Sequence, residues 1–364
     1  MSMQTEDRTQ GLQQRVADFK RDNPRSHARD VASAVGVREV QLAALSCGST
    51  ATRLDKRFRE LYEALPTLGE TKTMARSDAV VIERWGTFDK VEIGDHMGQV
   101  VGEEIDLRLF VSRWGSAFAV TEQGPRGERL SIQVFDDAGD SVQKVYLEDA
   151  ANRAAYDALV AAHRADDQGP HQEVGAPQPA PPEKPDADVD VAGFQKAWDK
   201  MQDTHDFYMI MRRFGVTRTQ ALRLGGRERA YPVSTKGLAY VLAQASQREM
   251  PIMLFVSNRG IIQIHTGLVK RVSPMEGWLN ILDPRLNLHV RESALAAGWV
   301  VKKPTKDGIV TSLELYDHKG DNVLLVFGKR KPGTPEDTGW RGLAGELPTD
   351  GSEPPRSTAS AEAS

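Results

Sequence analysis

The residues best suited to binding a metal or to nucleophilic chemistry are eight histidines and one cysteine. No two histidines have the spacing that places a pair of zinc ligands on one face of a helix. Because Cys47 is the only cysteine, the chain can form neither an internal disulfide nor a multi-cysteine zinc or iron–sulfur site. The Gly-x-Ser-x-Gly, phosphate-loop and His-Glu-x-x-His motifs are also missing from the sequence, which disfavours the common hydrolase and nucleotide-dependent chemistries.

His205 differs from the other histidines in its sequence setting. It belongs to a mainly apolar series at steps of four and three residues: Phe194, Trp198, Met201, His205 and Tyr208. This spacing predicts one stripe of an amphipathic helix that ends at Gly215. A histidine on such a stripe is commonly a core residue bonded to a backbone carbonyl. It could instead be an axial ligand of a large apolar cofactor such as haem, whose iron takes a neutral imidazole.

Residues 105–110 alternate in a way that predicts a strand with Asp106, Arg108 and Phe110 on one face. Such residues commonly lie on a solvated surface. If that face closed over a cavity, Arg108 beside Phe110 would line a pocket that is apolar and able to donate hydrogen bonds.

Positive charge near the ends of apolar segments marks a third group of candidates, formed by Arg218, Lys302–Lys303 and residues 329–331. Most basic residues solvate surfaces. Here they could also bind the carboxylates of an amphipathic ligand through charge-assisted hydrogen bonds.

Length and composition indicate a globular protein of about two domains. The chain has 364 residues, of which 40% are hydrophobic and 27% charged. Its net charge of -4 argues against a surface that binds nucleic acid throughout. The polar N-terminus lacks the apolar segment of a signal peptide, and no apolar run is long enough to span a membrane. We therefore expect a cytoplasmic protein that does not insert into membranes.

The sequence contains an internal repeat. Phe135-Asp136 with Gly139-Asp140 corresponds to Tyr316-Asp317 with Gly320-Asp321, and the segments beginning at Ile105 and Leu286 also match. Each copy begins with helical periodicity and continues as alternating strands with hairpin turns, among them SLELYDHKGDNVLLVFG. The fold class predicted is α+β, an internal duplication of two homologous halves, each with a large antiparallel sheet packed by helices.

Composition sets the predicted boundaries. Residues 1–163 form the first repeat and 191–331 the second, separated by a Pro-rich linker over 164–190. Residues 332–364 are rich in Gly, Pro, Ser and Glu and are predicted to be a disordered tail.

Several stretches together resemble the bacterial haemin-degrading factors, the haem-utilisation proteins of the HmuS, HemS and ChuS type. They are NPRSHARDVASAVGVREVQL, GEEIDLRLF, MPIMLFVSNRGIIQIHTG and the run from MEGWLNILDP to NLHVRE. The resemblance spans about Asn23 to Arg330 without the linker. It implies one haem b per chain, held mainly by the C-terminal half.

The resemblance also assigns site residues. His205 corresponds to the proximal iron ligand, and Arg108 and Phe110 to distal residues, with Arg108 as the catalytic candidate. Phe255 corresponds to a further haem contact, and Arg218, Lys303 and Arg330 to basic residues near the propionates. Relatives commonly have Gln-x-Tyr-Gly-x-Arg where this chain has Leu325, Phe327 and Arg330, so two polar contacts are missing here. In the first repeat Ser26 aligns with His205, while the adjacent His27 leaves a weaker second site conceivable.

The function implied by the resemblance is uptake of imported haem and its oxidative degradation to release iron, with an external electron donor. A second hypothesis is a non-catalytic carrier that stores haem or delivers it to a separate haem oxygenase. Expected partners are haem, a haem ABC transporter on its cytoplasmic side, and the electron donor or oxygenase.

Overall fold

The computed structural model describes residues 3–124, 127–176, 182–331 and 333–349. The chain forms two compact units, neither of which is continuous in sequence. The first unit comprises Met1–Arg76, Glu83–Gln178 and Asn258–Gln263, and the second comprises Ser77–Ile82, Pro179–Ser257 and Ile264–Ser364. The predicted division at one linker is therefore incomplete, because each unit also includes a short segment from the other half of the sequence.

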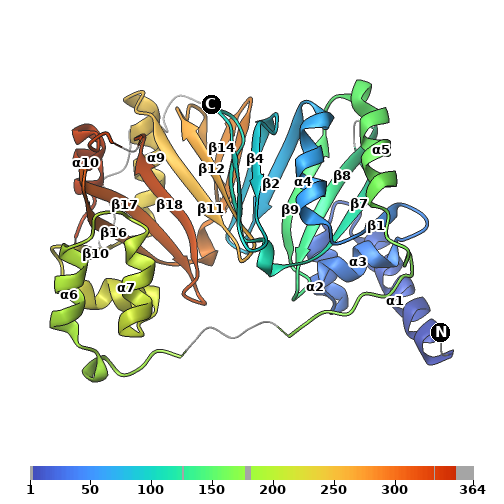
Figure 1. Ribbon diagram of the computed structural model, residues 1–364, viewed down its shortest axis with the longest axis horizontal. Helices are drawn as coiled ribbons and strands as arrows, with labels where there is room; N and C mark the ends of the chain where they lie inside the picture. The colour runs from blue at the N-terminus through green and yellow to red at the C-terminus, as the bar shows by residue number, and fades with distance from the viewer. Residues whose placement is uncertain (1–2, 125–126, 177–181, 332, 350–364) are drawn as a thin grey trace. The chain divides into compact units, whose positions relative to one another are not determined.

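The first unit begins with three helices, and two more flank its strands (Figure 1). The helices are α1 (Met3–Asp22), α2 (Ala28–Val35), α3 (Glu39–Leu45), α4 (Phe58–Ala64) and α5 (Arg153–His163), with 3-10 turns at Leu65–Leu68, Val111–Arg113 and Ala150–Asn152. The strands are β1 (Ala51–Leu54), β2 (Thr71–Arg76), β4 (Lys90–Ile93), β5 (Gly98–Val101), β6 (Asp106–Leu109), β7 (Trp114–Gly124), β8 (Gly127–Asp136) and β9 (Ser141–Leu147).

The second unit has the same order of elements. Its helices are α6 (Val191–Asp199), α7 (Asp206–Phe214), α8 (Arg218–Gly225), α9 (Gly237–Gln247) and α10 (Thr338–Gly345), with 3-10 turns at Asp186–Asp188 and Glu292–Ala294. Its strands are β10 (Ala230–Val233), β11 (Ile252–Ser257), β13 (Val272–Met275), β14 (Trp278–Asp283), β15 (Leu286–Arg291), β16 (Leu295–Thr305), β17 (Gly308–Asp317) and β18 (Asn322–Gly328). Strands β3 (Val80–Gly86) and β12 (Ile261–Gly267) are each divided between the units.

Strand pairing confirms the duplication. In the first unit the antiparallel neighbours are β1-β7-β8-β9-β2, and in the second they are β10-β16-β17-β18-β11. The bounds of β7, β8 and β9 recur 181 residues later in β16, β17 and β18. Even the register shift at the start of β7, between Trp114 and Ser116, recurs between Leu295 and Ala297. Both units are thus antiparallel sheets packed by helices, as the alternation and turn signals predict.

One face of the second unit's sheet is covered by its N-terminal helices. Figure 1 shows α6 and α7 beside the β10 and β16 edge. Phe194, Trp198 and Phe207 from these helices pack with Val301 and Tyr316 of the sheet, and all five are buried. Burying such large aromatic side chains supplies much of the apolar stabilisation of this unit.

The prediction of a disordered tail from residue 332 is wrong for the segment that contains α10. Trp340 is fully buried, and its indole N–H donates to the Thr311 carbonyl over 2.9 Å. A methyl group on Gly328 would lie 2.6 Å from the Trp340 side chain, so the helix packs directly on β18. A few apolar side chains thus outweigh the polar composition around them. Residues 350–364 lie outside the described part of the chain.

The predicted linker is anchored by side chains at both of its described ends. Arg53 donates to the Gly169 and His171 carbonyls over 3.0 and 2.8 Å. Near the other end Glu183 accepts a hydrogen bond from Thr217 over 2.6 Å. Residues 177–181 lie outside the described residues. The linker prediction therefore overlooked the polar contacts that hold residues 164–176 and 182–190.

Among the residues that the structure describes, no helix is long and apolar enough to cross a membrane.

Replacing Trp340 with Ala should lower the free energy of unfolding by about 3–5 kcal/mol, because it removes a fully buried aromatic ring and leaves a cavity. Chemical denaturation followed by circular dichroism would measure the change. Met209→Ala, at a residue that is 60% exposed, serves as the control. Equal stability of the two variants would contradict the packing of α10.

Candidate functional site

The helix predicted to carry His205 is broken, which changes the surroundings of this residue. Helix α6 ends at Asp199 and α7 begins at Asp206. Across the break the Asp206 carboxylate accepts from the backbone N–H groups of Gln202 and Asp203 over 2.9 and 3.0 Å. The turn changes the helical phase, so Phe207 is buried instead of His205. The prediction that His205 and Tyr208 share the buried stripe is therefore wrong.

His205 lies at the N-terminal end of α7, with its side chain 95% exposed. Its ring Nδ1 contacts Asp203 Oδ1 at 2.5 Å, and the same oxygen accepts the His205 backbone N–H over 2.9 Å. The backbone donor, together with the ring and the nearby Arg330, holds the pKa of Asp203 below its usual range. A carboxylate on Nδ1 leaves Nε2 free to bind a metal, the arrangement found around many metal-bound histidines.

A cluster of buried charges lies under the start of α8. The Glu314 side chain is fully buried on β17, and Arg218, the first residue of α8, donates Nε and Nη2 to it over 2.9 to 3.1 Å. Lys303 Nζ donates to Glu314 Oε1 over 2.8 Å, and the Tyr316 hydroxyl donates to Oε2 over 2.5 Å. Burial alone would raise the pKa of Glu314, but the two cations hold it well below its usual range. We call Arg218, Lys303, Glu314 and Tyr316 the Glu314 cluster.

Phe207 connects the Glu314 cluster to the helix that carries His205. Its ring centroid lies 4.8 Å from Lys303 Nζ and 5.6 Å from Arg218 Cζ, within the range of cation–π attraction. Since Phe207 follows His205 by two residues on α7, packing of this one ring fixes the start of the helix against both cations.

Partly exposed apolar side chains continue the same face of the sheet on β18 and β11. The register pairs Glu314 with Leu325 and Leu325 with Phe255. Because side chains on paired residues point to the same face, these three residues lie in a row across the sheet. Phe327 extends the row, with its ring centroid 5.2 Å from that of Phe255. We call Met253, Phe255, Leu325 and Phe327 the apolar strip.

Arg330 lies two residues after the end of β18, and its Nη1 is buried without a hydrogen-bond partner in the described structure. Its charge also contributes to the low pKa of Asp203. An unpaired buried donor is costly, so this guanidinium is suited to donate a hydrogen bond to an anionic group of a ligand.

Arg108 and Phe110 belong to the first unit, whereas the other predicted site residues belong to the second. Arg108 lies on β6 and donates to the Asp106 carboxylate and the Leu107 carbonyl. The ion pair confirms that Asp106 and Arg108 share a face, as alternation predicts. Burial raises the pKa of Asp106, although Arg108 opposes the effect. Phe110 is only partly buried.

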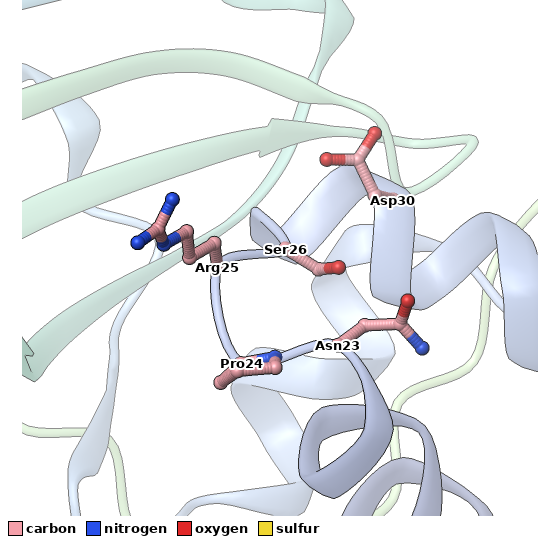
Figure 2. A pocket seen from close by; sticks show the side chains of 5 residues that line it. All are labelled: Asn23, Pro24, Arg25, Ser26 and Asp30. Carbon is pink, nitrogen blue, oxygen red and sulfur yellow. The ribbon is translucent and has the colours of Figure 1, made fainter.

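The first unit has no comparable histidine at the corresponding place. Figure 2 shows Ser26, the counterpart of His205, in a recess also lined by Asn23, Pro24, Arg25 and Asp30. None of these residues is aromatic or a strong ligand for iron. His27 instead occupies the N-cap position of α2, and its backbone N–H donates to Asp30 over 3.2 Å.

Asp203, Glu314 and Tyr316 are not among the site residues predicted from the sequence. Asp203 precedes His205 by two residues, a spacing that could have suggested a local hydrogen bond. Glu314 and Tyr316 alternate with apolar residues in a predicted strand, a pattern equally typical of a solvated face. Only the contacts with Arg218, far away in sequence, make them part of the site.

Comparison with known proteins places this geometry in a family. The model of the haemin-degrading HemS/ChuX domain matches residues 36–163 and again 215–347. The chain belongs to this haemin-degrading family. The second match extends to Leu347, beyond α10, which agrees with the packing of that helix in the second unit.

Relatives in the haemin-degrading family cover nearly the whole chain. Hemin transport protein HmuS of Yersinia pestis is 37% identical over 91% of this chain and 95% of its own length. The structure of holo-PhuS, a heme-binding protein from Pseudomonas aeruginosa, is similar with a TM-score of 0.91 and 38% identity, covering 94% and 99% of the two chains. The heme degrading enzyme ChuS of Escherichia coli O157:H7 gives a TM-score of 0.87 and 38% identity over 93% and 99%.

The Asp203 contact predicts the tautomer of the His205 ring in the ligand-free protein. A carboxylate that accepts from Nδ1 favours the form with its proton on Nδ1. In ¹⁵N NMR spectra near neutral pH, the neutral His205 ring should therefore be protonated mainly at Nδ1. Asp203→Asn should shift the population toward the Nε2-protonated form, whereas Asp199→Asn, on the preceding helix, should not. Identical ring shifts in all three proteins would contradict the assignment.

Proposed function

We propose that the chain binds haem b on the second unit, takes up haem that has been imported, and opens the ring oxidatively to release iron. One observation carries the proposal. His205, held through Nδ1 by Asp203, lies two residues from the Phe207 ring that packs against two cations, next to a partly exposed apolar strip. A haem has the matching parts: an iron, a flat apolar ring and two carboxylates.

Different residues would bind different parts of the haem. His205 Nε2 coordinates the iron, and Asp203 orients the imidazole and increases its strength as a donor. Phe255 and Phe327 support the ring and exclude water, while Arg218, Lys303 and Arg330 receive the carboxylates. With Leu325 and Phe327 in place of a polar pair, the strip binds the ring through apolar contact alone.

Degradation needs more than binding. Haem supplies the oxygen chemistry once electrons arrive from an external donor. The role of Arg108, donating hydrogen bonds to the oxygen side of the ring directly or through water, and that of Phe110 in closing that side, follow from the family resemblance and stay predictions. The chain would receive imported haem from a haem ABC transporter, on the cytoplasmic side of that transporter.

A single experiment separates degradation from carriage. Purified protein is loaded with one equivalent of haemin and given a reductant and catalase, with and without air. Stoichiometric formation of an open-chain tetrapyrrole only in air supports the enzyme. Haem that stays intact and passes to an added haem oxygenase would make the chain a carrier, and no saturable Soret band on titration would reject haem binding altogether.

His205→Ala should lower the affinity for haemin by at least about tenfold, equivalent to 1.4 kcal/mol, because ring burial remains but the iron loses its ligand. The Soret maximum should also move. Titration with haemin measures both, with His318→Ala as the control because His318 is exposed and its ring contacts the Ser293 carbonyl. Unchanged affinity and spectrum in the folded variant would redirect the search to His27 or His289.

Arg108→Ala should bind haemin within a few-fold of the parent but open the ring roughly 10²-fold more slowly, since loss of one donor to developing negative charge costs about 3 kcal/mol. Single-turnover spectroscopy measures the rate on haem that is already bound. Equal rates would remove Arg108 from the mechanism. Weak binding with a normal rate would make it a binding residue.

A further inference from the structure

The Glu314 cluster contains more positive than negative charge. Arg218 and Lys303 each carry one positive charge, and Glu314 is the only carboxylate bonded to either among the described residues. The side chains of Lys303 and Glu314 are 5% and 0% exposed, while that of Arg218 is 29% exposed. The cluster therefore has a net charge of about +1 although it is largely buried, and Arg218 is the member that is most exposed to solvent.

Free donors accompany the excess charge. Glu314 uses Nε and Nη2 of Arg218, so in the described structure Nη1 of this guanidinium has no partner. Lys303 donates one hydrogen bond to Glu314 and lies over the Phe207 ring. The cluster can thus offer hydrogen bonds and one unit of charge to a carboxylate that approaches from the Arg218 side.

The first unit has different side chains at the places of Glu314 and Arg218. Residue Gln133 occupies the place of Glu314, 181 residues earlier on the equivalent strand, and it is buried with its side-chain amide bonded to Ser131 over 3.0 Å. Glu39 begins α3 where Arg218 begins α8. The buried carboxylate of the first unit is that of Glu39 itself, which pairs with Lys144 at 3.6 Å. The same architecture therefore forms with a neutral residue at the strand position of Glu314, and the fold does not by itself require a carboxylate that holds two cations there.

We propose that Glu314 is a positioning residue for ligand recognition, which holds Arg218 and Lys303 side by side as a receptor for one carboxylate of the bound porphyrin. The inference rests on the proposed haem binding. Glu314 itself does not touch the ligand. It acts by fixing the guanidinium through hydrogen bonds to its Nε and Nη2 and by keeping Lys303 charged despite its burial.

This arrangement makes recognition depend on pH through Lys303. Burial lowers the pKa of Lys303 to about 8, with Arg218 on α8 adding repulsion and Glu314 on β17 opposing the shift. Tyr316, also on β17, keeps its proton because its pKa is raised by burial. A carboxylate binds the protonated amine better, so affinity should fall as pH rises through the pKa of Lys303. Without Glu314 that pKa would drop further, and the fall would begin at lower pH.

The test compares haemin with haemin dimethyl ester, which has the same iron and ring but no free carboxylates. Dissociation constants are measured by quenching of tryptophan fluorescence from pH 6.5 to 10. For the parent, the ratio of haemin to ester affinity should be about tenfold near pH 7, as expected for a charged hydrogen bond, and fall as pH rises through about 8. Comparing the two ligands cancels any titration of the iron.

Glu314→Gln should move the midpoint of this fall to lower pH, while Glu228→Gln, at an exposed position, should leave it unchanged. Should Glu314→Gln fail to fold, Lys303→Met replaces it, and its ratio should be low and independent of pH. Equal affinities for haemin and ester in the parent, or the same midpoint in parent and Glu314→Gln, would overturn the inference while haem binding stands. Failure of both ligands to bind at any pH would reject the proposed function and this inference with it.

Discussion

A carboxylate taken completely out of water must be neutralised, and the second unit is arranged around one such group. Glu314 has no exposed surface, and removing an ion from water costs several kcal/mol unless partners surround it. Arg218 and Lys303 come from different elements to meet it. The requirement to pair this charge therefore fixes α8 against β16 and β17, and Phe207 then positions α7 against the two cations.

Comparing the two units shows which features of the repeat are conserved between the copies and which have diverged. Strand bounds and the register shift at the start of β7 and β16 are retained, because they determine how the backbone pairs. Several side chains on the same face differ between the units, although Ser131 and Ser312 are identical. The place of Leu325 in the apolar strip is taken in the first unit by Lys144, which is buried beside Glu39 at 3.6 Å. The second unit therefore has an apolar surface with excess positive charge on this face. The first unit has buried ion pairs on the same face.

The features that the sequence predicts correctly are those with a local signal. The Asp-His-Lys-Gly-Asp turn and its counterpart in the first copy specify hairpins, since Gly320 and Gly139 both have the positive φ that such turns need. The helix containing His205 was mispredicted because the apolar steps continue through residues 200–205, while the break depends on hydrogen bonds to Asp206. Arg218, the cation on α8 that pairs with Glu314, lies 96 residues away along the chain, so no local pattern shows that this carboxylate is buried. The helix around Trp340 was mispredicted for a related reason. Three or four buried apolar side chains are enough to pack this helix, and they stand out little among the polar residues around them.

The discontinuous units have a consequence for how such a chain can be made. Ser77–Ile82 belong to the second unit and Asn258–Gln263 to the first, and these two segments are exact counterparts in the repeat. Asn258 donates to the Val142 carbonyl over 2.8 Å within the first unit, while Lys319 bonds to Asp78 over 3.0 Å within the second. During synthesis the N-terminal half therefore leaves the ribosome without a piece of its own unit, because Asn258 follows Gln178, the end of the preceding segment of that unit, by 80 positions. Reciprocal exchange of this kind is what fusion of two identical, segment-swapped subunits would leave behind, and it ties the folding of either copy to the completion of the other.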